Sequence, residues 1–469
     1  MEEVDEPNWE CAHRLLQCVA VASRPLLVSE LAEFLAFDFE AGPTPTFLAD
    51  WRPKDPTHTV LSVCSSLLAV VKPRGGPPVV QFAHFSVKEY LMSARLAKAK
   101  DTVSRFHVSM TSAHTVVAQA CLGLLLHLDE NITRRSLENF PLAEYAAKHW
   151  MDHAQFENVS SNVQDGMESL FDPSKNHFSI WVWLRDPVDP WRLCGPSERP
   201  EKAGATPLYY AAFCGMRDVA AFLIVQHSQD VNARGFDNET SLHVVSRYGH
   251  AGVARLLLEH GADAEAQDND KRTPLLIASD DGHVEVVRVL LEYDADTKAR
   301  DKNGWSPLEL ASFFGRVEVA RALLEHGADV KAKDMGKQTP LHFARGEEVA
   351  RFLLENGADA NALDIEDQTP LHQASEDGRA GAARVLLEHG VDVNARDTNK
   401  ATALHLASRP TYHRRAAGHP DVVRLLLKHS PDIHARDDGG QTPFMRATAE
   451  GNHIIMQLLS ECRAEDHRL

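Results

Sequence analysis

Histidine and acidic residues are the side chains best suited to bind metals or transfer protons, and this sequence contains 25 His and 67 Asp plus Glu. Many of them recur at matched places in successive segments of about 33 residues. Four follow a Thr-x-Leu tripeptide and three precede a Gly: His243, His342, His372 and His405, then His260, His326 and His389. Residues that recur once per segment lie side by side and do not converge on one ion. We therefore predict no metal site and no catalytic histidine.

Aspartates recur in the same way, one in each loop between segments. They are Asp268, Asp301, Asp334, Asp364, Asp397 and Asp437. Short acidic side chains at such positions accept hydrogen bonds from backbone N–H groups of a turn, so turn formation explains them better than acid–base catalysis does.

The motifs of nucleotide and hydrolytic chemistry are missing from the sequence. A phosphate-binding loop needs GxxxxGK[ST], and residues 335–339 (MGKQT) lack its first glycine and fall in a loop between segments. GxSxG, HExxH and the kinase motifs are also missing. We predict a non-enzymatic protein with no cofactor.

Each segment encodes a pair of helices, as residues 268–300 illustrate. Thr273 is an N-cap residue, Pro274 suits the first helical position, and Gly282 can end the first helix in the left-handed conformation. In the second helix Val287 and Leu290 lie on one apolar stripe. One such pair buries only one side, so neighbouring copies must cover the other.

The segment 301–333 and its relatives resemble the ankyrin repeat. We expect eight units in residues 204–469, the fifth shortened and the seventh carrying an insertion at 409–417. The resemblance implies a mainly all-α solenoid with short β-hairpin loops. It also implies that a protein partner binds the concave face, to which the ends of the first helices and the hairpin tips point.

The residues at those variable positions are our candidates for partner binding. At the helix ends they are Phe213, Arg247, Tyr248, Asp280, Asp281, Phe313, Phe314, Glu376 and Asp377, and at the tips Arg272, Lys302, Trp305, Met335 and Ile365. Exposed aromatic side chains are costly in water and are favoured anchors at interfaces. Residues 305, 313 and 314 are therefore the strongest candidates.

The N-terminal part reads as a different fold. Residues 9–22, 28–36 and about 59–67 have helical patterns, and residues 68–71 and 79–82 are β-prone runs around a Gly/Pro loop. Three helices and a hairpin are the order of a winged helix. We expect a winged-helix-like domain over 1–103, a helical region over 104–165, and a Pro/Trp-rich linker over 166–203 that packs on the array.

A local motif follows the hairpin, in residues 82–91 (FAHFSVKEYL). Ser86 and Glu89 have the spacing of a capping box, and Phe85 and Tyr90 that of a hydrophobic staple, which predicts a helix starting at Ser86. With residues 145–150 (YAAKHW), the stretch resembles the region after the nucleotide-binding core of fungal NACHT-type STAND proteins. The resemblance implies a link to a P-loop NTPase domain, and it makes His84 a candidate nucleotide sensor if such a core is supplied.

Composition excludes several classes of protein. The formal net charge of −18 disfavours binding to nucleic acid or to an anionic membrane, and no apolar run reaches the roughly eighteen residues of a membrane span. Seven scattered cysteines without a CxxC pair fit a reducing compartment, cytoplasmic or nuclear.

Two functions remain open. The first is a non-catalytic protein-interaction module of a NACHT/STAND-like signalling or sensor protein. The alternative is a DNA-binding regulator that uses the winged helix, with Lys72 and Arg74 touching phosphate, although Glu30 and Glu33 would give the second helix the wrong charge.

Overall fold

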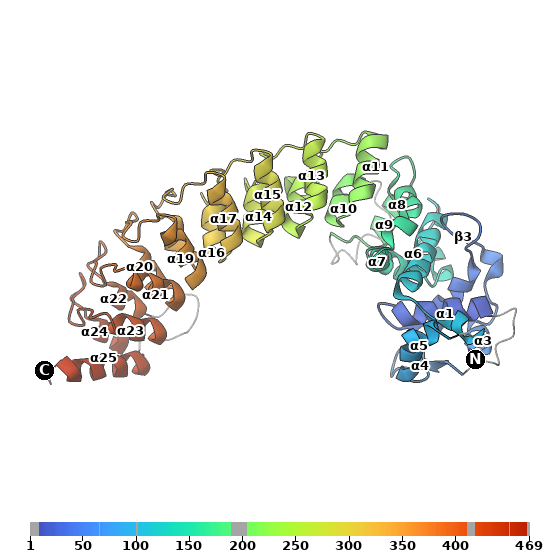
Figure 1. The fold of residues 1–469 in the computed structure, drawn as a ribbon, viewed down its shortest axis with the longest axis horizontal. Helices are drawn as coiled ribbons and strands as arrows, with labels where there is room; N and C mark the ends of the chain where they lie inside the picture. Colours follow the sequence, from blue (N-terminus) through green and yellow to red (C-terminus); the bar gives the residue numbers. More distant parts are fainter. Residues whose placement is uncertain are drawn as a thin grey trace. The chain divides into compact units, whose positions relative to one another are not determined.

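The computed structural model describes residues 9–64, 66–99, 102–188, 204–409, 418–449 and 451–466. It is mostly helical, which confirms the predicted fold class, and it forms two compact units, Met1–Asp230 and Val231–Leu469 (Figure 1). No helix in the described ranges is both long and apolar enough to cross a bilayer.

The first half of unit 1 has the expected three helices and hairpin. The elements are α1 (Trp9–Val21), β1 (Leu26–Leu27), α2 (Val28–Glu33), η2 (Phe34–Ala36), β2 (Phe37–Asp38), β3 (Thr46–Phe47), η3 (Ala49–Trp51), α3 (Pro56–Cys64), β4 (Leu68–Val71) and β5 (Val79–Phe82). Strand β5 lies between β1 and β4 in an antiparallel sheet, where Val80 pairs with both Leu26 and Val70. The sequence predicted the β4–β5 hairpin but not β1, which is only two residues long.

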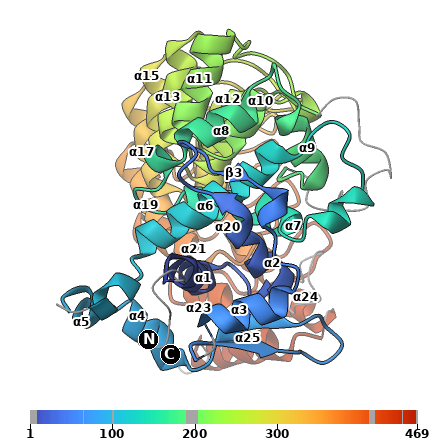
Figure 2. The same ribbon diagram turned by 90° about the vertical axis from the view of Figure 1, so that its right-hand side faces the viewer.

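The second half of unit 1 is helical. Its elements are α4 (Phe85–Leu91), α5 (Ala94–Ala97), η4 (Thr102–Phe106), α6 (Met110–His127), η5 (Ser136–Asn139), α7 (Ala143–Ala154), η6 (Ser160–Asn162), α8 (Gln164–Phe171), α9 (His177–Leu184), α10 (Pro207–Phe213) and α11 (Arg217–His227). The long helix α6 packs against α1 and α7 (Figure 2). It is buried over most of its length because its apolar residues extend all round the helix.

An aromatic cluster joins the end of the helical region to the first repeat inside unit 1. The Trp181 ring lies 5.6 Å from that of Trp150 and 6.2 Å from that of Tyr210, and Trp181 Nε1 donates to the Ala147 carbonyl at 3.0 Å. The segment predicted as a linker thus holds two short helices, α8 and α9, and residues 189–203 lie outside the described ranges. The predicted domain boundaries stay predictions.

Two acidic residues of α2 are not surface charges, contrary to expectation. Glu30 and Glu33 are buried, and their carboxylates pair with Arg24 and Arg52, each at 2.6 Å. Helix amphipathicity does not reveal this arrangement, because the arginines come from other segments. The two glutamates therefore do not make the surface around α2 negatively charged.

Unit 2 is a row of helix pairs (Figure 1). After η8 (Phe236–Asn238), the first helices of the repeats are α12 (Ser241–Tyr248), α14 (Pro274–Asp281), α16 (Pro307–Phe313), α18 (Pro340–Phe343), α20 (Pro370–Glu376), α22 (Ala403–Ala407) and α24 (Pro443–Ala449). The second helices are α13 (Ala251–Glu259), α15 (Val284–Glu292), α17 (Val317–Glu325), α19 (Glu347–Glu355), α21 (Ala380–Glu388), α23 (Pro420–Leu427) and α25 (His453–Asp466). Each first helix contacts its own second helix and the first helix of the next repeat.

Repeat 3 shows why the sequence folds this way. The Thr273 side chain accepts from the Leu276 N–H, Pro274 occupies the first turn, and Gly282 ends α14 with a φ of 86°. Val287 and Leu290 are fully buried in α15. These local predictions are confirmed.

Repeat 5 departs from the pattern at its turn. Helix α18 has four residues and ends at Ala344, whose φ of −54° and ψ of 116° are not helical, without the left-handed glycine that ends α14. The turn to α19 passes directly through Arg345 and Gly346. Of the insertion predicted in repeat 7 at 409–417, residues 410–417 lie outside the described residues.

Candidate protein-recognition surface

The recurring histidines form hydrogen bonds that join one repeat to the next. In repeat 6, His372 Nδ1 accepts from the Thr369 N–H at 3.2 Å, and Nε2 contacts the Ala401 carbonyl of repeat 7 at 3.3 Å. The equivalent histidines reach the carbonyls of Arg272, Gln368 and Gln441 at 3.0 to 3.2 Å. Because the Thr N–H can only donate, Nδ1 must carry a lone pair and Nε2 the proton. These imidazoles are structural.

Burial keeps the same imidazoles neutral. It lowers the pKa of His243 to about 4, and it also lowers the pKa of His342, His372 and His405. No group of three or more His, Cys, Asp or Glu side chains suited to a metal ion occurs in the described ranges.

The loop aspartates act as the sequence suggested. Asp268 Oδ1 accepts from the backbone N–H groups of Asp270 and Arg272, each at 2.8 Å. The same two bonds, to residues two and four positions ahead, recur at Asp301, Asp364 and Asp397. Each carboxylate is therefore engaged in forming its turn.

Repeat 4 has Glu309 where repeats 2, 5, 6 and 7 have histidine. Its Oε2 accepts from the Ser306 N–H at 2.7 Å and pairs with Arg300 at 3.1 Å. The side chain is fully buried, and within the described residues Oε1 has no hydrogen-bond partner. Burial raises the pKa of this carboxyl. Repeat 4 thus keeps the cap but lacks the bond to the next repeat.

The concave positions of repeat 4 carry an aromatic patch, which we define as Trp305, Phe313 and Phe314. The Phe313 ring centroid lies 5.3 Å from that of Trp305 and 5.0 Å from that of Phe314. Trp305 also packs at 4.4 Å on the buried Phe343 of repeat 5. Trp305 and Phe313 are half-buried and Phe314 is 42% exposed, so the patch is held by its own packing and still faces solvent.

Two guanidinium groups flank the aromatic patch. That of Arg345 lies 4.9 Å from the Phe313 ring centroid and that of Arg379 lies 6.0 Å from it. Arg379 is anchored by Asp377 and by the His342 carbonyl at 2.8 Å, whereas Arg345 is exposed and pairs with no carboxylate in the described part of the chain. Sequence reasoning missed both arginines, and the only signal was the shortened turn before Arg345.

Among the other predicted residues, three basic side chains form ion pairs, and the rest are exposed or half-buried to different extents. Arg247 pairs with Glu239, Arg272 with Asp268 at 3.0 Å, and Lys302 with Asp270 at 2.7 Å. Tyr248, Met335 and Ile365 are 47%, 82% and 60% exposed. Asp280 is half-buried, which raises its pKa, beside the exposed Asp281. Phe213 belongs to unit 1, where it is half-buried at the end of α10.

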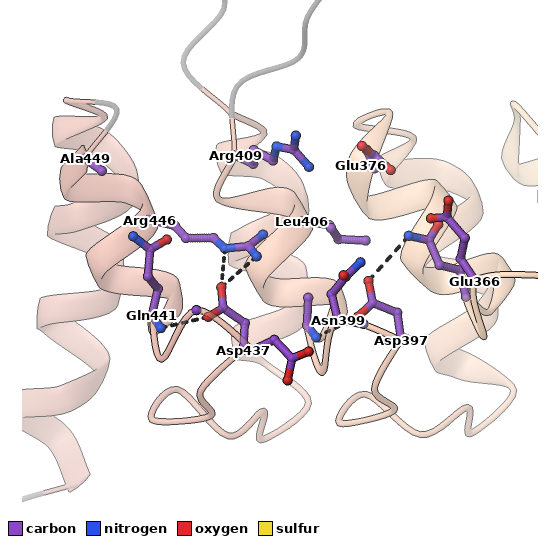
Figure 3. A pocket seen from close by; sticks show the side chains of 14 residues that line it. Glu366, Glu376, Asp397, Asn399, Leu406, Arg409, Asp437, Gln441, Arg446 and Ala449 are labelled. Carbon is purple, nitrogen blue, oxygen red and sulfur yellow. Dashed lines mark hydrogen bonds and ion pairs between the residues drawn. The ribbon is translucent and has the colours of Figure 1, made fainter.

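An acidic concavity of about 560 Å³ lies in repeats 6 to 8 (Figure 3). Glu366 and Glu376 line one side, Arg446 and Gln441 the other, and Leu406 and Arg409 lie between them. Asp437 in the concavity is neutralised by Arg446 at 2.7 Å. Among the described residues, the Glu366 and Glu376 carboxylates have no ion pair and no hydrogen bond. Sequence reasoning selected Glu376 as a site residue.

His84 has a local structural contact in unit 1. Its Nδ1 lies 2.8 Å from Ser86 Oγ and accepts from the Ser86 N–H at 3.3 Å, so His84 is the N-cap of α4. The predicted cap at Ser86 is wrong by two residues, and Phe85, 69% exposed, forms no staple. The nucleotide-sensor role stays a prediction.

Stacked helix pairs joined by tight loops, with a constant packing side and a variable concave side, define a repeat protein of the kind that recognises other proteins. Residues 191–268, 242–334, 333–397, 347–436 and 394–468 match the family described as ankyrin repeats (3 copies), and together these matches cover more than half of the chain. The chain belongs to the ankyrin-repeat family. Residues 7–106 match the winged helix domain of GPI inositol-deacylase.

Individual proteins resemble parts of the chain. The azaphilone pigments biosynthesis cluster protein L of Monascus ruber is 28% identical over 268 residues, 54% of this chain and 56% of that protein, so the match spans about half of each. The human ASB11 ankyrin repeat domain is 28% identical with a TM-score of 0.42, covering 48% of this chain and 98% of its own. The ankyrin repeat domain of Bcl-3, of the IkappaB family, is 27% identical with a TM-score of 0.40, covering 48% and 99%.

Proposed function

We propose that this protein is a non-catalytic recognition module that binds a protein partner through the concave face of its ankyrin array. The observation that carries the proposal is the aromatic patch of repeat 4. The positions of Phe313 and Phe314 are filled by Asp280 and Asp281 in repeat 3 and by Glu376 and Asp377 in repeat 6. Since the array packs with polar residues there, packing alone does not require the aromatic ones.

The size of the face fits this role. A standard protein interface buries about 800 Å² on each side, which corresponds to a few adjacent repeats. Exposed aromatic side chains at the centre of such a face supply much of the binding free energy, and polar surroundings set the orientation of the partner.

A site-specific crosslink tests the proposal. A photoreactive phenylalanine derivative at position 314 should crosslink a protein partner in extract of the native host. The same derivative at position 293 is the control, because Tyr293 is 37% exposed at the end of α15. Phe314→Ala in the otherwise native chain should then abolish capture of the crosslinked protein and leave thermal unfolding unchanged. Equal crosslinking from both positions would reject the concave face as the binding surface.

We further propose that the chain works in a NACHT/STAND-like signalling or sensor protein, in the cytoplasm or nucleus, together with a P-loop NTPase domain. The order of a winged helix, a helical region and an ankyrin array supports this proposal, as does the match of residues 7–106 to a winged-helix family. Joining the chain to such a core and comparing its nucleotide response with that of the His84→Ala variant tests it. An unaltered response would end the sensor role of His84.

A further inference from the structure

The concave face of repeats 4 to 8 has an apolar region and an acidic region, and together they indicate which side chains a partner presents. Repeat 4 presents the aromatic patch, and repeats 6 to 8 present the acidic concavity. Both lie in unit 2. The inference drawn from this division rests on the proposed function, because it concerns what binds at the same face.

The two regions are parts of one continuous surface. Arg379 lies 6.0 Å from the Phe313 ring centroid and forms an ion pair with Asp377. Asp377 is adjacent in sequence to Glu376, which lines the concavity. A bound chain can therefore follow the surface from the aromatic patch to the concavity without leaving it.

The charges inside the concavity are not balanced from within the array. Asp437 and Asp438 have partners, Arg446 at 2.7 Å and Lys400 at 2.7 Å. Glu366 and Glu376 do not, in the described part of the chain, and they line the same side of the concavity (Figure 3). Partial burial raises the pKa of Glu376; Arg409 offsets this, and the nearby Asp377 and Glu366 carboxylates raise it further. A cation held between the two carboxylates would relieve that repulsion.

The surface between the aromatic patch and the acidic concavity is positively charged. Arg345 is exposed over the Phe313 ring and has five N–H donors with no carboxylate to receive them among the described residues. Such a group donates hydrogen bonds to backbone carbonyls or to an acidic side chain and repels a cation. The cationic residue of a partner is therefore directed past Arg345 to the concavity.

We infer that the partner presents an extended segment with an apolar side chain that sits on Phe313 and Phe314 and a Lys or Arg side chain that enters the concavity between Glu366 and Glu376. Helices α16, α18 and α20 pack in succession, so the two subsites are two helix spacings apart. At about 8–10 Å for each spacing, they are separated by roughly 20 Å. An extended chain rises about 3.3 Å per residue, which places the two side chains roughly six residues apart.

Selection from a phage-displayed library of random dodecapeptides tests this inference on the full chain. Enriched peptides should carry an apolar residue about six positions from a Lys or Arg, in either direction along the peptide. A synthetic, fluorescein-labelled representative is then titrated by anisotropy against three variants: Phe314→Ala, Glu366→Gln with Glu376→Gln, and Glu285→Gln with Glu325→Gln. The last is the charge control, because those two glutamates are exposed on second helices.

The expected result is a Kd raised about tenfold by the Glu366/Glu376 variant, because one charge-assisted contact is lost. The control should leave the Kd unchanged. Peptides that lose binding with Phe314→Ala but carry no excess of Lys or Arg would overturn the inference and leave the recognition face standing. Peptides indifferent to Phe314→Ala would instead overturn the proposed face itself. Glutamine at 366 and 376 removes charge without removing volume, and thermal unfolding confirms that the variants are folded.

Discussion

Repeats 4 and 6 share the same capped helix pair but differ in the bond to the next repeat and in the residues of the concave side. In repeat 6 the first helix is capped by Thr369 with His372, and the imidazole reaches the Ala401 carbonyl of repeat 7. In repeat 4 Ser306 and Glu309 form the same cap, but the bond to the next repeat is missing and one buried carboxylate oxygen has no partner. On the concave side, repeat 4 has Phe313 and Phe314 where repeat 6 has an acidic pair.

The two sides of a repeat are subject to different structural requirements. The packing side uses the same histidine in repeats 2, 5, 6 and 7, because each repeat must pack against its neighbour. The concave side is free of that requirement, so its residues differ from repeat to repeat. Repeat 4 departs from the rule on both sides, which makes it the best place to separate stability from recognition.

Acid should weaken the whole array, and this is the largest effect we expect. The pKa of His243 is lowered to about 4 by burial, so the folded state favours the neutral ring, while the unfolded chain binds protons below about pH 6.5. Stability is therefore complete above pH 6.5 and is lost as the pH falls toward 4, at about 1.4 kcal/mol per pH unit for each such histidine.

Urea unfolding of the chain at pH 7.5, 6 and 5 measures this loss. His243→Leu is the matched variant, because repeat 3 carries Leu276 at the equivalent position. Its stability should fall less steeply with acid than that of the unmodified chain. A urea midpoint that stays constant from pH 7.5 to 5 would contradict the neutral, hydrogen-bonded state of these rings.

His372→Ala should break one junction at neutral pH. It leaves the buried Thr369 N–H without its acceptor and removes the inter-repeat bond to the Ala401 carbonyl, which still accepts from the Asp397 N–H. We expect a loss of roughly 2–4 kcal/mol in the free energy of unfolding. The control is His389→Ala, whose ring forms a hydrogen bond within its own repeat, to the Val385 carbonyl at 2.8 Å. Urea midpoints compare the two, and equal losses would show that the inter-repeat bond is unimportant.

Glu309→His should make repeat 4 resemble repeat 6. The imidazole can accept from the Ser306 N–H and donate to the Gln338 carbonyl, as its counterparts do in other repeats. The substitution also removes the buried carboxylate of Glu309. We expect a gain of about 1 kcal/mol in the free energy of unfolding at pH 7.5. Differential scanning calorimetry measures it. A clear loss would mean that the Arg300–Glu309 pair stabilises the repeat more than the bond to the next repeat does.

Phe314→Ala should change stability least, by less than about 0.5 kcal/mol, because the residue is 42% exposed at the surface of the array. Trp305→Ala is the useful contrast, since that ring packs on Phe343 and Phe313 and its loss should lower the melting temperature. If both variants were equally destabilised, the aromatic patch would be core and not surface.

Local features of the repeats could be predicted from the sequence because they depend on neighbouring residues. Thr273, Pro274 and Gly282 lie within ten positions and define a helix by themselves. The cap of α4 was misplaced because Ser86 has the better intrinsic preference, whereas the backbone actually turns at His84, whose ring bonds to Ser86. Local spacing does not distinguish these two solutions.

The recognition surface could be predicted only in part. Its aromatic residues stand out in repeat 4, but Arg345 and Arg379 reach Phe313 from repeats 5 and 6. The acidic concavity combines Glu366 and Glu376 with residues of two further repeats. Which side chains meet depends on how successive repeats are stacked, and local spacing in the sequence does not give that arrangement.

The short first helix of repeat 5 also has a consequence for the mechanics of the array. A linear array transmits force and unfolds through its junctions, and α18, with four residues, offers the least helix to its neighbours on either side. Under load the array should yield there first and separate into two blocks. A partner that spans repeats 4 to 6 would link the two blocks across this junction. Binding would therefore raise the stiffness of the array beyond the residues that the partner contacts.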